Sequence, residues 1–202
     1  MFMRHVAPLL ATLACAPLSA HASPAVDQPA PSFIANTADG RSVNLDSLKG
    51  KTVLLEWTNH DCPFVRKHYE SGNMQGLQKD AAAKGVVWMQ VISSAPGKQG
   101  NVDGATALKL NSTRGATPAH VILDPEGKLG KLYGAQTTPH IFIIDARGLL
   151  AYKGGIDSLA SADKADIAKA EPYVSEALSA LAAGKKITAS NTKPYGCSVK
   201  YE

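Results

Sequence analysis

The amino-acid sequence predicts an α/β protein, in which a central mixed sheet lies between two layers of helices in a three-layer α/β/α sandwich. The prediction depends on three continuous apolar runs, at 53–55, 86–92 and 141–144. A strand that is covered on both faces is apolar throughout, whereas a half-exposed strand alternates apolar and polar residues. The segments between the runs combine helical composition with turn residues, so we expect helices to cover the sheet.

The first half of the chain supplies elements on either side of the first two runs. Residues 23–31 are rich in Ala and Pro and predict a flexible lead-in, and the turn Asp39-Gly40 after Phe33-Ile34 predicts a short hairpin. Residues 63–84 predict a helix that is kinked or divided at Ser71-Gly72-Asn73. The polar stretch 93–104 predicts a surface loop.

The second half predicts three further helices and a hairpin. We expect a short helix at 105–111, a strand at 121–123, a turn at 124–127, a short helix ending near 134 and a turn at 145–148 that joins the strand 141–144 to 149–152. In the last helix Val174, Leu178 and Leu181 lie at i, i+4 and i+7, with Pro172 in the first turn and Gly184 past the end.

The first 22 residues have the composition of a secretory signal peptide. Arg4 precedes an apolar stretch at 6–18, and Ala20-His21-Ala22 is a small-x-small cleavage site. The apolar stretch is too short to span a bilayer. We therefore expect cleavage after Ala22, a periplasmic or secreted location and no integral membrane segment. A lipid on Cys15 is the alternative, although Thr12 occupies a position where a large aliphatic residue is usual.

Charge and motifs exclude several classes of function. The net charge is +4 and scattered, without a basic block, so we expect no nucleic-acid partner. Hydrolase, Walker and dinucleotide-binding motifs are absent from the sequence. The processed chain is long enough for one core, which predicts one domain at 23–190 and a C-terminal tail at 191–202 that carries Cys197.

Cys62 is the residue at which we expect the chemistry. It follows an apolar strand and a polar loop, and Pro63 opens a predicted helix. The backbone N–H groups and the dipole at a helix start favour the thiolate and lower the pKa of a cysteine. We therefore expect an ionised and accessible thiol; the alternative is a small buried hydrophobic residue.

Two neighbours of Cys62 are candidates for activating it. His60 can accept the thiol proton or stabilise the thiolate, and Arg66 adds positive charge one helical turn further on. The alternative is an exposed loop histidine and a solvated helix arginine. We expect His68 and Tyr69 to pack on the sheet or to face water.

Four motifs connect this chain to a known family. They are Pro31-Ser32-Phe33 with Asp39-Gly40 and Leu48-Lys49-Gly50, Cys62 at the strand-to-helix turn, Thr137-Thr138-Pro139-His140 before the third apolar run, and the closing hairpin 148–154. In this order they resemble the thioredoxin-like superfamily, in particular its alkyl hydroperoxide reductase and thiol-specific antioxidant (redoxin) branch, over about residues 30–184. The resemblance implies a thioredoxin-like sandwich with a cis Thr138-Pro139 bond, beside which a peroxide or an incoming chain docks.

Departures from the family pattern refine this expectation. Val65 stands where a dithiol thioredoxin has its second cysteine, so a local CxxC pair is excluded. Peroxiredoxins typically have Thr three residues before the nucleophile; this chain has Asn59 there, and Thr58 is our candidate for contacting substrate. The chain looks more similar to peroxiredoxin-like redoxins that pair the active-site Cys-Pro with a cysteine in a C-terminal tail, here Cys197.

The number of thiols suggests a mechanism. If Cys62 reacts with peroxide it becomes a sulfenic acid, and if it attacks a disulfide it becomes a mixed disulfide; both states need a second thiol. Cys197 is the only candidate left after cleavage, although a purely structural disulfide is an alternative. The sequence thus predicts a thiol-dependent oxidoreductase that needs no bound cofactor, acts on a peroxide or disulfide, and is regenerated by an unidentified thiol reductant.

Metal binding is the second class of function that the residues allow. Cys62, His60 and His140 are ligand types suited to copper if they converge near Pro139. Thioredoxin-fold copper chaperones of the cell envelope usually carry a second nearby cysteine, which this chain lacks. A third alternative is an interaction module with a vestigial site.

Overall fold

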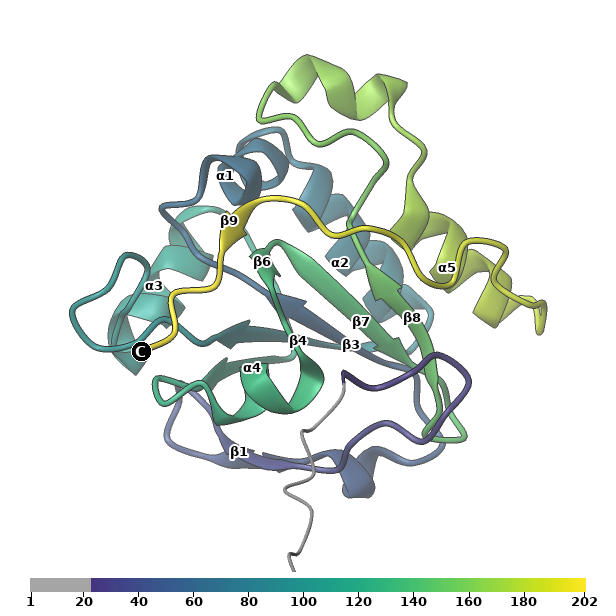
Figure 1. Ribbon diagram of the computed structural model, residues 1–202, viewed down its shortest axis with the longest axis horizontal. Helices are drawn as coiled ribbons and strands as arrows, with labels where there is room; N and C mark the ends of the chain where they lie inside the picture. Colours follow the sequence, from purple (N-terminus) through teal and green to yellow (C-terminus); the bar gives the residue numbers. More distant parts are fainter. Residues whose placement is uncertain (1–22) are drawn as a thin grey trace, which may run out of the picture.

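The computed structural model describes residues 23–202; the predicted signal peptide and Cys15 lie outside the described residues. Five strands form the central sheet in the order β5-β4-β3-β7-β8 (Figure 1). They are β3 (Val53–Trp57), β4 (Val87–Ile92), β5 (His120–Leu123), β7 (His140–Ile144) and β8 (Leu150–Gly154). β3 pairs in parallel with β4 and antiparallel with β7, which confirms the mixed sheet.

Helices and a hairpin cover the two faces of this sheet. One face packs against α1 (Pro63–Glu70), α2 (Asn73–Ala83) and α5 (Tyr173–Ala182). The other packs against α4 (Lys128–Tyr133) and the hairpin of β1 (Ile34–Asn36) and β2 (Ser42–Asn44), which leads into the 3₁₀ helix η1 (Leu45–Leu48). α3 (Gly104–Thr113) contacts the edge strand β5. The three-layer thioredoxin-like sandwich is therefore confirmed.

Most predicted elements are present, and the differences occur in short segments. The helix predicted at 63–84 is divided into α1 and α2, with Gly72 at a φ of 79° between them. The loop predicted at 93–104 begins inside the molecule, because Ser93, Ser94 and Ala95 are buried. Four elements were not predicted: the 3₁₀ helices η1 and η2 (Lys164–Lys169) and the two-residue strands β6 (Thr137–Thr138) and β9 (Cys197–Ser198).

The C-terminal tail lies along the body of the domain. In Figure 1 it runs from the end of α5 past β8 to β6 and α1. Its contacts begin at Asn191, which bridges to Lys153 of β8, and continue to β9, which pairs with β6. Among residues 23–202, no helix is long and apolar enough to cross a membrane.

Candidate active site

The loop between β3 and α1 fixes the position of Cys62. The Asn59 side chain accepts a hydrogen bond from the Asp61 N–H at 2.9 Å, and the Asn59 carbonyl accepts one from the Cys62 N–H at 3.0 Å. These two bonds close a tight turn of the kind that Asn side chains favour. Gly100 packs on Asn59 so closely that any side chain at position 100 would collide with it. Cys62 consequently becomes the N-cap of α1, and Pro63 occupies the first helical turn.

Two groups lie next to the Cys62 sulfur atom. Its Sγ lies 3.1 Å from the Thr138 carbonyl oxygen and 2.7 Å from the Cys197 Sγ. The Thr138-Pro139 peptide bond is cis, as the resemblance implied. Cys62 is fully buried, so the expectation of an accessible thiol is wrong for this state of the molecule. The sequence alone does not reveal that the tail returns to cover the helix start.

Backbone pairing holds the second cysteine in place. In the antiparallel pair β6–β9, Thr138 stands opposite Cys197 and Thr137 opposite Ser198, and the Val199 N–H donates to the Gln136 carbonyl at 2.9 Å. Gly196 has a φ of 129°, and a side chain there would collide with the Thr138 carbonyl oxygen. Glycine before Cys197 therefore lets the tail approach close enough for the two sulfurs to meet.

The two thiols differ in acidity. Burial opposes ionisation of Cys62, but the hydrogen bond from Cys197 and further hydrogen bonds outweigh it, so that the pKa of Cys62 is lowered. Burial, the hydrogen bond to Cys62 and the negative charge of Cys62 raise the pKa of Cys197 to about 11. Cys62 is consequently the more acidic thiol of the pair, and Cys197 keeps its proton to a higher pH.

The other predicted site residues lie near the loop without touching the sulfur. His60 Nε2 is 3.3 Å from Asp61 Oδ1, and Arg66 Nε is 2.8 Å from Glu70 Oε1 on the exposed side of α1. In the part of the chain that the structure describes, neither side chain forms a hydrogen bond or ion pair with Cys62. Thr58 is buried at the end of β3. The roles given to these three residues stay predictions.

The copper hypothesis gains no support from the geometry. His140 is buried, with its Nδ1 accepting from the Gln136 N–H at 3.2 Å and its ring 4.4 Å from that of Phe142. Between residues 23 and 202, no three His, Cys, Asp or Glu side chains form a group that could hold a metal ion. Cys62, His60 and His140 therefore do not converge as three ligands.

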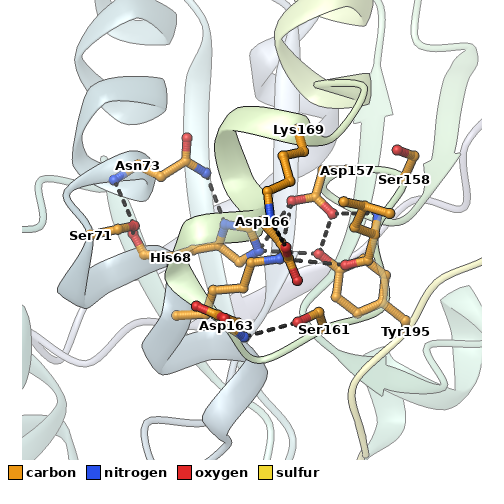
Figure 2. Close-up of polar contacts among 12 residues, drawn as sticks. His68, Ser71, Asn73, Asp157, Ser158, Ser161, Asp163, Asp166, Lys169 and Tyr195 are labelled. Carbon is orange, nitrogen blue, oxygen red and sulfur yellow. Dashed lines mark hydrogen bonds and ion pairs between the residues drawn. The ribbon is translucent and has the colours of Figure 1, made fainter.

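A buried polar cluster under the tail was missed by the sequence analysis. It consists of Lys67 and His68 on α1, Asp157 after β8, and Tyr195 in the tail, all buried. Figure 2 shows the side chains of His68, Asp157 and Tyr195 pointing toward one another. His68 had a signal in the sequence, because it shares the i, i+3, i+4 spacing of buried Val65 and Tyr69. Its partners, distant in sequence, had none.

The fold and the paired thiols define a thioredoxin-like thiol protein, and comparison with known proteins agrees. The chain belongs to the AhpC/TSA family, whose model matches residues 26–153. Membership in this family, together with the geometry of Cys62 and Cys197, indicates thiol redox chemistry. A search of the curated proteins gives no match.

Solved structures share the fold at low sequence identity. A conserved protein from Geobacillus kaustophilus has a TM-score of 0.74 at 21% identity, over 88% of this chain and 93% of that one. A protein from Sinorhizobium meliloti 1021 has a TM-score of 0.73 at 20% identity, over 90% and 97%. A thiol:disulfide interchange protein of the thioredoxin family from Chlorobium tepidum TLS has a TM-score of 0.51 at 25% identity, over 77% and 99%.

Proposed function

We propose that this protein is a two-cysteine thiol oxidoreductase, in which Cys62 is the nucleophile and Cys197 the resolving thiol. The observation that carries the proposal is the 2.7 Å contact between the two sulfur atoms. The acidity difference supports the same assignment, since the pKa of Cys62 is lowered and that of Cys197 is raised. A nucleophile needs the thiolate, and a resolving thiol is needed only in the second step.

The proposed cycle balances for either oxidant. With a peroxide, the Cys62 thiolate attacks the outer oxygen, the O–O bond breaks, and a sulfenic acid and an alcohol or water result. Cys197 then attacks the Cys62 sulfur, the S–O bond breaks, and water leaves as the disulfide forms. With a disulfide, Cys62 forms a mixed disulfide and releases one thiolate, and Cys197 displaces the other. Each route takes two electrons from the protein. Two external thiols, or one dithiol, return them and are themselves oxidised to a disulfide.

The wider setting is proposed from the sequence and from the named relatives. The leader at 1–22 supports a periplasmic or secreted enzyme with residues 23–190 as its catalytic domain. The similarity to the Chlorobium thiol:disulfide interchange protein supports disulfide exchange, whereas the AhpC/TSA family supports peroxide reduction. Residues around the thiols, among them Thr58, Thr138 and Pro139, then contact the substrate. His60 accepts the thiol proton or stabilises the thiolate, and Arg66 adds positive charge near the loop.

The experiment is intact-mass analysis of the reduced chain after one equivalent of hydrogen peroxide or of glutathione disulfide. We expect rapid loss of two hydrogen atoms with one of the two oxidants, which names the electron acceptor. Cys197→Ser should stop at the first adduct on Cys62, and Cys62→Ser should not react at the same rate. The proposal is overturned if Cys197→Ser turns over like the wild type without an added small thiol, or if Cys62→Ser is oxidised as fast as the wild type.

A further inference from the structure

The tail that supplies Cys197 also closes the site. Cys62 is fully buried while Cys197 is only partly buried, so reagents that reach the reduced Cys62 thiolate need the tail to move. The strand pairing of β9 is only two residues long. The tail is therefore held on the domain by side-chain contacts as well as by this short strand pair.

Tyr195, two residues before Cys197, makes several of these contacts with buried side chains. Its hydroxyl donates to Asp157 Oδ1 at 2.5 Å and lies 3.2 Å from His68 Nε2. Its ring packs edge-on against Phe64 of α1, with the centroids 5.9 Å apart. One side chain thus joins the tail to the segment after β8 and to the helix that Cys62 caps.

The hydrogen bonds around Tyr195 form a chain in which each side chain donates to the next. Asn73 Nδ2 lies 2.9 Å from His68 Nδ1 and can only donate, so His68 carries its proton on Nε2 and donates to the Tyr195 oxygen. Tyr195 in turn donates to Asp157 (Figure 2). Burial lowers the pKa of His68 to about 4, despite the opposing charge of Asp157, so the ring is neutral and suits this relay near neutral pH.

An ion pair completes the cluster. Asp157 Oδ2 has no hydrogen bond among the described residues and faces Lys67 Nζ at 3.6 Å. Lys67 has a fully buried side chain and also donates to the Leu159 carbonyl at 3.4 Å. Buried ion pairs are weak evidence for stability, because desolvation cancels much of their attraction. A hydrogen bond to a charged acceptor is nevertheless stronger than a neutral one. The bond from the Tyr195 hydroxyl to Asp157 therefore holds Tyr195 in place.

The partners in this cluster come from different parts of the chain. The family match ends at residue 153, so Asp157 and Tyr195 lie beyond it, as does Cys197. Lys67 and His68 lie within it, on the helix that Cys62 begins. The contact therefore connects the segment that is shared with the family to the segment that follows it.

We propose that Tyr195, held by Asp157, His68 and Lys67, is a latch that positions the tail and controls access of reagents to Cys62. When the latch is closed, Cys197 contacts Cys62 and shields it. When it opens, an oxidant reaches the thiolate, and reclosing brings Cys197 back for the second step. This inference rests on the proposed role of Cys62 as the reacting thiol, but the docking of the tail can be tested without turnover.

The test is the rate at which iodoacetamide alkylates Cys62 in the reduced full chain, followed by peptide mapping. Tyr195→Phe removes one oxygen atom and keeps the ring contact with Phe64. Because the lost bond ends on a charged acceptor, we expect alkylation of Cys62 to accelerate by about tenfold or more. Tyr133→Phe is the matched control: it removes a buried tyrosine hydroxyl that donates to the Pro31 carbonyl at 2.7 Å on the opposite face of the sheet.

The control separates a latch from general destabilisation. Both variants should lower the thermal midpoint, but only Tyr195→Phe should speed alkylation of Cys62. Equal rates in Tyr195→Phe and the wild type, or equal acceleration in both variants, would overturn the latch. Such a result would not contradict the two-cysteine cycle. Conversely, if the cycle is contradicted by the oxidation experiment, the alkylation rates still report whether the tail covers Cys62.

A second measurement uses the wild type alone and does not depend on whether a variant folds. Alkylation of Cys62 is followed in increasing urea below the unfolding transition. Local opening of the tail exposes little surface, so we expect a rate that is nearly independent of urea. A rate that rises in parallel with global unfolding would show that the tail does not open separately, and would contradict the latch.

Discussion

The two faces of the central sheet are built from different kinds of contact. On the face covered by α4 and the β1–β2 hairpin, the Trp57 ring packs against those of Phe142 and Tyr133, with centroids 5.1 and 5.7 Å apart. The face covered by α1, α2 and α5 encloses the ionisable residues Glu56 and Lys67 and the Cys62 thiol, all fully or almost fully buried. We call the first side the aromatic face after this ring cluster, which is packed among aliphatic side chains. We call the second side the polar face after its buried ionisable groups near the tail, although it also contains aromatic residues.

The two faces therefore contribute differently to the molecule: the aromatic contacts mainly stabilise the fold, and the polar contacts mainly position the tail. Aromatic burial removes large apolar areas from water and stabilises the fold wherever it occurs. A buried ion pair such as Lys67–Asp157 contributes little net stability, but removal of one partner is costly, so it favours one arrangement over others. We therefore expect substitutions on the aromatic face to change the free energy of unfolding alone, and substitutions near the tail to change the reactivity of Cys62 as well.

The largest expected effect is on activity alone. Cys62→Ser replaces the sulfur by an oxygen that is not ionised near neutral pH, so we expect complete loss of peroxide or disulfide turnover. Because serine is similar in size, the urea midpoint should change little. Turnover that persists in this variant would place the chemistry elsewhere.

The aromatic face should show the opposite result. Trp57 is fully buried, and Trp57→Ala is expected to lower the free energy of unfolding by about 4 kcal/mol, as measured by urea denaturation. At low temperature, where the variant remains folded, the first oxidation of Cys62 should proceed as in the wild type. A stability loss below about 1 kcal/mol would show that the aromatic contacts do not support the core.

Acid should weaken the polar face. Burial is the main cause that lowers the pKa of His68 from 6.5 to about 4, so the unfolded chain binds a proton at a higher pH than the folded chain does. Stability that is fully present above pH 6.5 is then lost as the pH falls toward 4, by about 3 kcal/mol from this residue. Urea titrations across this range should show a smaller loss for His68→Gln, and an unchanged loss would contradict the assignment.

The smallest predicted effect concerns two glycines with positive φ. Gly196 has a φ of 129° and lies against the Thr138 carbonyl, whereas Gly148 has a φ of 83° and open space around it. Both substitutions place alanine at a positive φ, which costs about 1–2 kcal/mol, and Gly196→Ala adds a collision with the Thr138 carbonyl oxygen. Only Gly196→Ala should also slow formation of the Cys62–Cys197 bond, by about tenfold, as followed by quenched mass analysis. Equal rates in the two variants would show that the close approach at Gly196 is not needed.

The sequence predicted much of the fold because its signals are local. The run at 53–55 marks β3 and the broken helical pattern at 63–84 gives α1 and α2. The placement of Cys62 at a helix start follows from the residues on either side of it. The cis bond at Thr138-Pro139 was expected only through family resemblance.

The rest of the site depends on contacts between distant residues. Strands β6 and β9 have two residues each, too few for any periodic pattern. Lys67 is buried because Asp157, far along the chain, faces it, and no property of either local sequence indicates the pairing. Burial of Cys62 likewise depends on where the tail docks, which the tail sequence does not specify.

The most direct test of the account is peptide mapping of the reduced chain after one equivalent of the effective oxidant at low protein concentration. We predict that Cys62 and Cys197 lose their thiols together and appear as one cross-linked peptide within a single chain. A dithiol reductant should then return both thiols. Oxidation of Cys62 with the Cys197 thiol retained would contradict the pairing on which the proposed function depends.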